Sequence, residues 1–153
     1  MRTLFCCLSL LAVATHVAAR EITPCDLTPH AFEDQLVTIS ARALFTMHGA
    51  YLLGSSCTGK GQYSAALLLP GEKGSPLVSF ELDPSSLASL KPFFRTTGGQ
   101  AFACGLFSGR VFYKKGFRLR HFDEITIGNG FGEHGTLQAG FVIESVKDVR
   151  ACD

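Results

Sequence analysis

The sequence lacks most of the local patterns that identify enzymes and metalloproteins. It contains no tryptophan, no C-x-x-C pair, no H-E-x-x-H and no G-x-S-x-G. The missing patterns argue against a zinc site with a local signature and against a serine nucleophile on a strand-to-helix elbow. No low-complexity tract or linker interrupts the chain. No catalytic residue, metal site or cofactor is therefore predicted from motifs.

The chain begins with very little charge. Arg2 is followed by an apolar run from Leu4 to Val13 and by small residues near Ala19. This order is typical of a cleavable secretory signal, so we expect residues 1–19 to be a signal peptide. The apolar run is shorter than the roughly 20 residues that span a bilayer, and no later segment approaches that length. The sequence predicts an exported protein, periplasmic or extracellular, with no integral membrane segment.

Acidic and basic residues are almost balanced. The whole chain has 14 Lys and Arg against 13 Asp and Glu, and the mature chain from Arg20 is neutral because Arg2 falls in the predicted signal. Neutrality gives no support for a general affinity for nucleic acid or anionic membranes. The remaining length suffices for one hydrophobic core but not for two, so residues 20–153 are predicted to form a single domain.

The mature chain keeps an even number of cysteines, which predicts two disulfides in an exported protein. They are Cys25, Cys57, Cys104 and Cys152. Three pairings are open. We expect Cys25 to pair with Cys152, because each lies near one terminus, which leaves Cys57 with Cys104. Metal binding by these thiols is disfavoured because the compartment is oxidising.

Alternation of apolar and polar residues predicts a mainly β fold. The expected strands cover residues 36–44, 51–53, 63–69, 101–113, 117–127 and 137–146, and residues 77–82 are a candidate for one further short strand. A hairpin turn is expected at residues 46–49, where His48 and Gly49 break the first run. The glycines Gly105 and Gly109, inside a long strand, suit the bends that a small barrel requires.

Two segments carry helix signals. Thr28–Asp34 has a capping hydroxyl, a proline and acids, and predicts one or two helical turns. Asp83 and Pro84 form a stronger start for a helix over Ser85–Lys91. Three strands, a helix and further strands follow the order of an OB fold. We therefore predict an OB-like, five- to six-stranded Greek-key barrel with one helix between strands three and four, stapled by disulfides.

Two stretches of the sequence resemble a known group. They are V-T-I-S-A-R-A-L-F-T-M-H-G-A-Y-L-L, which begins at Val37, and G-F-G-E-H-G-T-L-Q-A-G-F-V-I-E-S-V-K-D-V, which begins at Gly130. Both resemble small exported bacterial proteins of uncharacterised function with an OB-like core. The resemblance covers about two-thirds of the mature chain. It implies a fold and a compartment, and it offers no catalytic residues.

Two glycine motifs imitate phosphate-binding loops. Gly130–Gly135 spells G-x-G-x-x-G, but the residues after it favour a strand where a dinucleotide site needs a helix. Gly54–Lys60 spells G-x-x-x-x-G-K, but Gly61 stands where Ser or Thr must hold Mg²⁺. Neither dinucleotide nor nucleotide triphosphate binding is predicted. We expect Gly128–Gly135 to be a glycine-rich connection that displays its polar residues before the last strand.

The predicted function is non-catalytic binding of a protein, a glycan or another anionic ligand. The expected binding loops are residues 48–58 and 129–135, with His48, Tyr51 and His134 as candidate contacts. One alternative is a small hydrolase or a metal-binding protein in which His48 meets Glu133 and His134 in space. His121 is expected to be partly buried on its strand.

A second alternative is oligosaccharide or oligonucleotide binding through a basic segment, residues 110–120. This segment carries five cations and no acid: Arg110, Lys114, Lys115, Arg118 and Arg120. OB barrels bind such ligands by aromatic stacking and basic contacts. The competing interpretation is a solvated hairpin edge that its lysines and arginines protect from aggregation.

Overall fold

A computed structural model describes residues 20–27, 31–54, 63–69, 82–94 and 98–152. The strands are β1 (Arg20–Ile22), β2 (Leu36–Thr46), β3 (Gly49–Leu53), β4 (Tyr63–Leu68), β5 (Gln100–Tyr113), β6 (Leu119–Phe122), β7 (Ile125–Gly128) and β8 (Ala139–Ala151). The helical elements are η1 (Pro24–Asp26), α1 (Pro84–Leu90), η2 (Lys91–Phe93) and η3 (Glu133–Gly135). The mainly β class is confirmed. The predicted signal peptide and Cys57 lie outside the described residues. Of the candidate strand over residues 77–82, only Leu82 is described.

Five strands form a closed ring in the order β2, β3, β4, β8 and β5, and the ring closes because β5 also pairs with β2. Neighbours in the ring are antiparallel except β4 and β8, which are parallel. β1 pairs in parallel with the first half of β2. α1 lies between β4 and β5 in sequence, and its Leu90 belongs to the main core cluster. No helix in the described part of the chain is long and apolar enough to cross a membrane.

The alternation along β2 decides which side chains enter the ring. Val37, Ile39 and Phe45 are buried in the main core cluster. The opposite face of β2 carries Thr38, Ser40 and Arg42, and there the Thr38 hydroxyl shares a 2.8 Å hydrogen bond with Ser108 on β5. One face of β2 therefore packs against the main core, while the other is polar in its first half and buries Leu44 in a second, smaller cluster with Tyr51 and Leu53.

The pairing of β5 with β8 is irregular at Gly105 and Gly109, the two positions where the sequence predicted bends. The register shifts next to Gly105 and again at Gly109. A Cβ on Gly109 would lie 2.1 Å from the Val142 carbonyl oxygen, and one on Gly105 would lie 2.9 Å from that of Lys147. Only glycine allows β8 to approach β5 this closely, so the predicted role of both glycines agrees with the structure.

The stronger helix prediction is confirmed. Asp83 is the N-cap of α1 and accepts a 3.0 Å hydrogen bond from the Ser86 amide, with Pro84 in the first turn. The hydroxyl of Ser85 also donates to this carboxylate. The hydrogen bond from Ser85, followed by those from Ser86, lowers the pKa of Asp83 below 3.8. The cap therefore remains charged in mild acid and satisfies an amide at the start of the helix.

The weaker helix prediction is wrong for its described part. Residues 31–34 form a turn, and Glu33 makes a β-bridge with Val111. The Asp34 amide donates to the Val111 carbonyl oxygen at 2.8 Å, and Asp34 itself has a φ of 56°. The backbone here bonds to β5 instead of closing helical turns, so a tertiary contact overrides the local helix signal.

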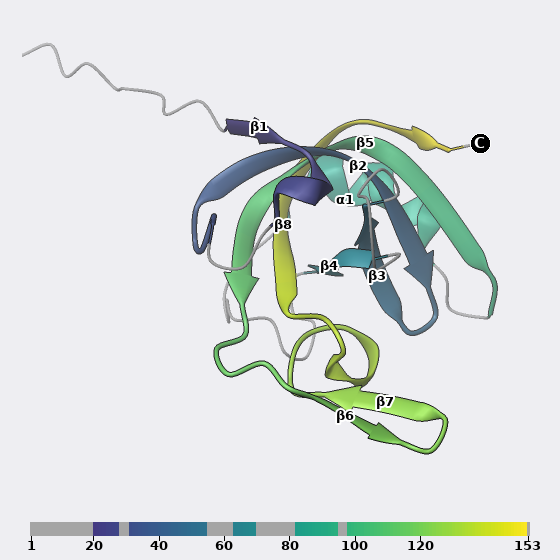
Figure 1. Cartoon of the computed structure of the whole chain (residues 1–153). Coiled ribbons are helices and arrows are strands. Elements are labelled where there is room, and N and C mark those ends of the chain that lie inside the picture. Colours follow the sequence, from purple (N-terminus) through teal and green to yellow (C-terminus); the bar gives the residue numbers. More distant parts are fainter. Residues whose placement is uncertain (1–19, 28–30, 55–62, 70–81, 95–97, 153) are drawn as a thin grey trace, which may run out of the picture.

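The single strand expected over residues 117–127 is also wrong. β6 and β7 form a two-stranded hairpin that turns at Asp123 and Glu124, with Asp123 at a φ of 49°. Figure 1 shows this hairpin projecting from the ring. His121 is exposed instead of partly buried, and its Nδ1 lies 2.9 Å from the Thr126 hydroxyl. The pattern missed the turn because apolar residues continue on both sides of it.

The expected disulfide pairing is wrong as well. Cys104 on β5 is bonded to Cys152, with 5.4 Å between their Cα atoms. This bond excludes both the Cys25–Cys152 and the Cys57–Cys104 pairs. β8 runs antiparallel to β5, with Arg150 opposite Cys104 and the Cys152 amide bonded to the Phe102 carbonyl oxygen. The end of the chain therefore meets β5 instead of returning to the first cysteine.

Candidate functional site

The turn between β2 and β3 carries the first functional side chain, His48. The Thr46 hydroxyl donates to the Gly49 carbonyl oxygen and accepts from the His48 amide, both at 3.1 Å. Gly49 has a φ of 134°, a conformation that favours glycine. These contacts fix the turn and display His48 at its tip, with its side chain 54% exposed.

The glycine-rich connection before β8 carries the other functional side chains. Backbone bonds join Gly130 to Gly135 at 2.8 Å and Phe131 to Leu137 at 2.7 Å. A Cβ on Gly130 would lie 2.0 Å from the Leu137 carbonyl oxygen, so the loop can fold back on itself only with glycine there. The three-residue η3 leads into β8, so the motif is followed by a strand, as the sequence predicted.

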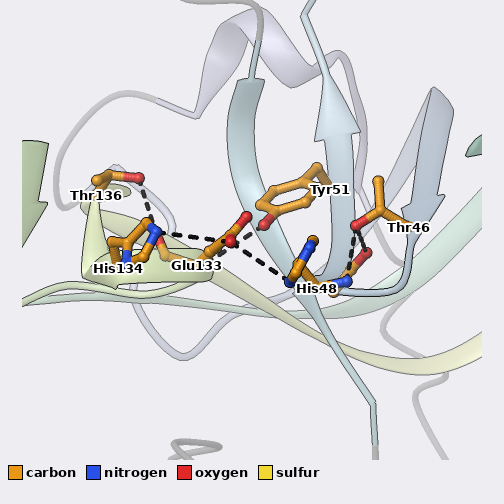
Figure 2. Close-up of polar contacts among 7 residues, drawn as sticks. Thr46, His48, Tyr51, Glu133, His134 and Thr136 are labelled. Atoms are coloured by element: carbon orange, nitrogen blue, oxygen red, sulfur yellow. Dashed lines mark hydrogen bonds and ion pairs between the residues drawn. The ribbon is translucent and has the colours of Figure 1, made fainter. Parts of the chain in front are cut away.

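The two loops bring two histidines to one carboxylate (Figure 2). The same oxygen of Glu133, Oε1, lies 3.4 Å from His48 Nδ1 and 3.6 Å from His134 Nε2. Tyr51 on β3 accepts a 3.3 Å hydrogen bond from the Glu133 amide, which ties η3 to the ring. The sequence analysis proposed that His48, Glu133 and His134 meet in space. In the structure they do, with the Glu133 carboxylate between the two imidazoles.

This cluster lines a pocket of about 530 Å³, which we call the histidine pocket. Its polar lining consists of Thr46, His48, Gln100, Glu133, His134 and Thr136. Met47, Tyr51 and Leu137 add apolar surface. A few convergent polar groups with apolar contacts are typical of small-ligand sites.

A second pocket, of about 670 Å³, shares His48 and Glu133 with the first. Its other side is lined by Phe131, Tyr113 and Lys114. Burial, with a smaller contribution from the charge of Glu33, raises the pKa of Tyr113 to about 12. The Tyr113 hydroxyl is therefore neutral at physiological pH. The His48–Glu133 pair thus belongs to the lining of both pockets.

The cluster has no hydroxyl that is free to act as a nucleophile among the threonines of its lining. Thr46 is bonded within its turn, and the Thr136 hydroxyl donates to the Glu133 carbonyl oxygen at 3.2 Å. In the described ranges, no three His, Cys, Asp or Glu side chains are grouped so that they could hold a metal ion. What remains is a carboxylate and two imidazoles that can exchange hydrogen bonds, or a proton, with a ligand.

The predicted basic residues do not join this cluster. Arg110 is structural, because its Nε contacts Glu144 Oε1 and its Nη1 donates to the Asp34 carbonyl oxygen, both at 2.9 Å. Lys114, at the end of β5, lines the second pocket. The remaining three are exposed: Lys115 and Arg118 precede β6, and Arg120 lies within it.

Sequence reasoning missed Gln100 and the two threonines of the pocket lining. Gln100 enters because it opens β5 opposite Thr46, the last residue of β2. The alternating pattern predicts both strands but contains no information on their register. Thr136 could have been suspected from its position beside Glu133 and His134.

Comparisons with protein-family models, with curated proteins and with solved structures find no match to this chain. The function is therefore inferred from the geometry of the site.

Proposed function

We propose that this protein is an exported OB-type binding module whose ligand is an oligosaccharide. The ring order, with α1 between its third and fourth strands, supports the OB assignment. OB barrels bind oligonucleotides or oligosaccharides with the loop between strands one and two and the loop between strands four and five. Here those loops are the β2–β3 turn, which carries His48, and residues 114–138, which carry Glu133. Their meeting around the histidine pocket is the observation that carries the proposal.

The charge of the pocket favours a neutral ligand. The lining contains the carboxylate of Glu133 and no lysine or arginine, so the pocket disfavours a polyanion. A carboxylate, an amide and imidazoles offer both donors and acceptors to neighbouring sugar hydroxyls. Met47 and Leu137 offer apolar contact to the C–H face of a sugar ring. An oligonucleotide would instead need the exposed basic residues, which lie outside this pocket.

A second function, glycoside hydrolysis by acid–base chemistry, is favoured by one observation. Glu133 Oε1 lies within 3.6 Å of both histidines, so proton transfer through this cluster is geometrically accessible. The cluster lacks the second carboxylate that most glycosidases use, within its described lining. Binding without turnover is therefore the primary proposal.

The test is an NMR titration of the isotopically labelled mature protein with chitotetraose, cellotetraose, maltotetraose and oligodeoxythymidine. We expect a tetrasaccharide to shift the amide resonances of His48, Gln100 and Glu133. Glu133→Gln should weaken that binding about tenfold or more, because a charge-assisted hydrogen bond is lost. Glu124→Gln, the same change at the exposed tip of the β6–β7 hairpin, should leave the affinity unchanged.

Each other outcome has a definite meaning. Shifts confined to Arg118 and Arg120 on adding oligodeoxythymidine would identify an oligonucleotide module instead. Cleavage of a tetrasaccharide that Glu133→Gln abolishes, with binding retained, would support the hydrolase. If no saccharide shifts the pocket resonances, the oligosaccharide proposal is wrong.

A further inference from the structure

A third pocket lies on the outer surface of β2, β5 and β8, and its lining shares no residue with the histidine pocket or the second pocket. In the strand register Arg42 stands opposite Cys104, and Cys104 stands opposite Arg150. Directly opposed residues of antiparallel strands point to the same face. The two arginines therefore flank Cys104 on one face, separated by two strand spacings, or about 10 Å at the backbone.

Both arginines line a hollow of about 470 Å³, which we call the arginine pocket. Ser40 and Thr23 add hydroxyl groups to the lining, and Asp148 adds its carboxylate. In the described part of the chain, neither Arg42 nor Arg150 forms an ion pair with a carboxylate. The lining therefore holds two guanidinium groups and one acid that neutralises neither by direct contact.

Arg42 is held in place before any ligand arrives. Its guanidinium carbon lies 4.0 Å from the centroid of the Phe102 ring. Its Nε is buried and has no hydrogen-bond partner. A partly desolvated cation without a counter-charge creates a positive potential in the hollow, and stacking reduces the ordering cost of binding an anion.

We propose that the arginine pocket binds a phosphate group. A tetrahedral phosphate has enough oxygens to accept hydrogen bonds from two guanidinium groups at once, whereas a single carboxylate is satisfied by one bidentate arginine. The hydroxyl of Ser40 supplies a further donor. The group can belong to inorganic phosphate or to a phosphate ester on a larger molecule, and both present the same oxygens.

The experiment is calorimetric and NMR titration of the mature protein with inorganic phosphate, with glucose 6-phosphate and with glucose, at an ionic strength kept constant with chloride. We expect saturable binding of a phosphate compound and a shift of the Arg42 Nε–H resonance. Arg150→Gln and Arg42→Gln should each weaken binding about tenfold or more. A preference for glucose 6-phosphate over inorganic phosphate would identify an ester, and the reverse order would identify the free ion.

Two further variants sharpen the result. Asp148→Asn should strengthen binding, because it removes a negative charge from the lining; Asn is also well suited to the φ of 55° at this position. Arg118→Gln, on the exposed path into β6, should leave the affinity unchanged. Arg150 is exposed, so its variant should fold even if Arg42→Gln does not. Unchanged affinity in Arg150→Gln, or no saturable binding of either phosphate compound, would overturn the proposal.

Discussion

Ser86 joins α1 to the ring through one buried hydroxyl. Its side chain is 1% exposed, and its Oγ accepts a 2.9 Å hydrogen bond from the Val146 amide on β8. The same hydroxyl donates to the Asp83 carboxylate at 3.0 Å. A buried amide without a partner is costly, so this serine has a structural role that its surface-like neighbours in α1 lack.

Ser86→Ala is expected to lower the free energy of unfolding by about 1–3 kcal/mol, because it leaves the Val146 amide buried and unsatisfied. Urea denaturation of the protein measures this. Ser89→Ala is the matched control, since Ser89 is exposed and bonds only to the Ser85 carbonyl oxygen in its own helix. Equal losses in the two variants would show that the bond to β8 contributes nothing specific.

Residue types at the site could be predicted, but their contacts could not. His48 and Glu133 attracted attention because polar side chains in glycine-containing loops are often displayed for ligands. Their 3.4 Å contact depends on how the β2–β3 turn lies against η3, which no local pattern encodes. The same limit explains why the disulfide partner of Cys104 was predicted wrongly. The partner, Cys152, follows from the pairing of β5 with β8, whereas the prediction relied on how near each cysteine lies to a terminus.

Secondary structure elements were predicted well where one signal dominates. The alternation in β2 and the cap at Asp83 placed both elements close to their observed bounds. The prediction failed at residues 117–127, because Asp123 and Glu124 interrupt a segment whose apolar residues continue on both sides. Two acids are a weaker turn signal than glycine or asparagine, although Asp123 adopts the positive φ that such a turn needs.

The β6–β7 hairpin displays apolar side chains that the ring does not cover. Phe122 and Ile125 face each other in register, and each is 55% exposed. The base of the hairpin is fixed separately, since Asn129 accepts from the Arg118 amide at 2.8 Å and donates to the Gly116 carbonyl oxygen at 3.1 Å. Stability of the ring should therefore be nearly independent of the hairpin tip.

Replacing both Phe122 and Ile125 with Ser is expected to change the free energy of unfolding by no more than about 0.5 kcal/mol, since exposed positions contribute little. Urea denaturation of the variant and of the wild-type protein measures this difference. Phe107→Ala, at a fully buried position on β5, should cost about 3–5 kcal/mol. A comparable loss from the hairpin variant would mean that its tip is covered in the folded protein.

At the scale of the whole molecule, β5 connects the parts. It pairs with β2 along one edge and with β8 along the other, which closes the ring. The main core runs through the ring and includes Leu90 of α1. The outer face of β2 and β5 carries the arginine pocket in its middle and reaches the histidine pocket at Thr46 and Gln100. Both proposed sites thus depend on the same pair of strands remaining in register.

The Cys104–Cys152 bond secures that register at the end of β8. It links residues that are 48 apart in sequence, so it restricts the unfolded chain strongly. Replacing both cysteines with Ser is expected to lower the free energy of unfolding by about 3–4 kcal/mol on the chain-entropy account. Urea denaturation should also give a larger m-value, because the unfolded chain without this link expands and exposes more surface. A double variant with the wild-type midpoint and m-value would contradict this, and would mean that pairing between β5 and β8 holds the end of the chain without the covalent bond.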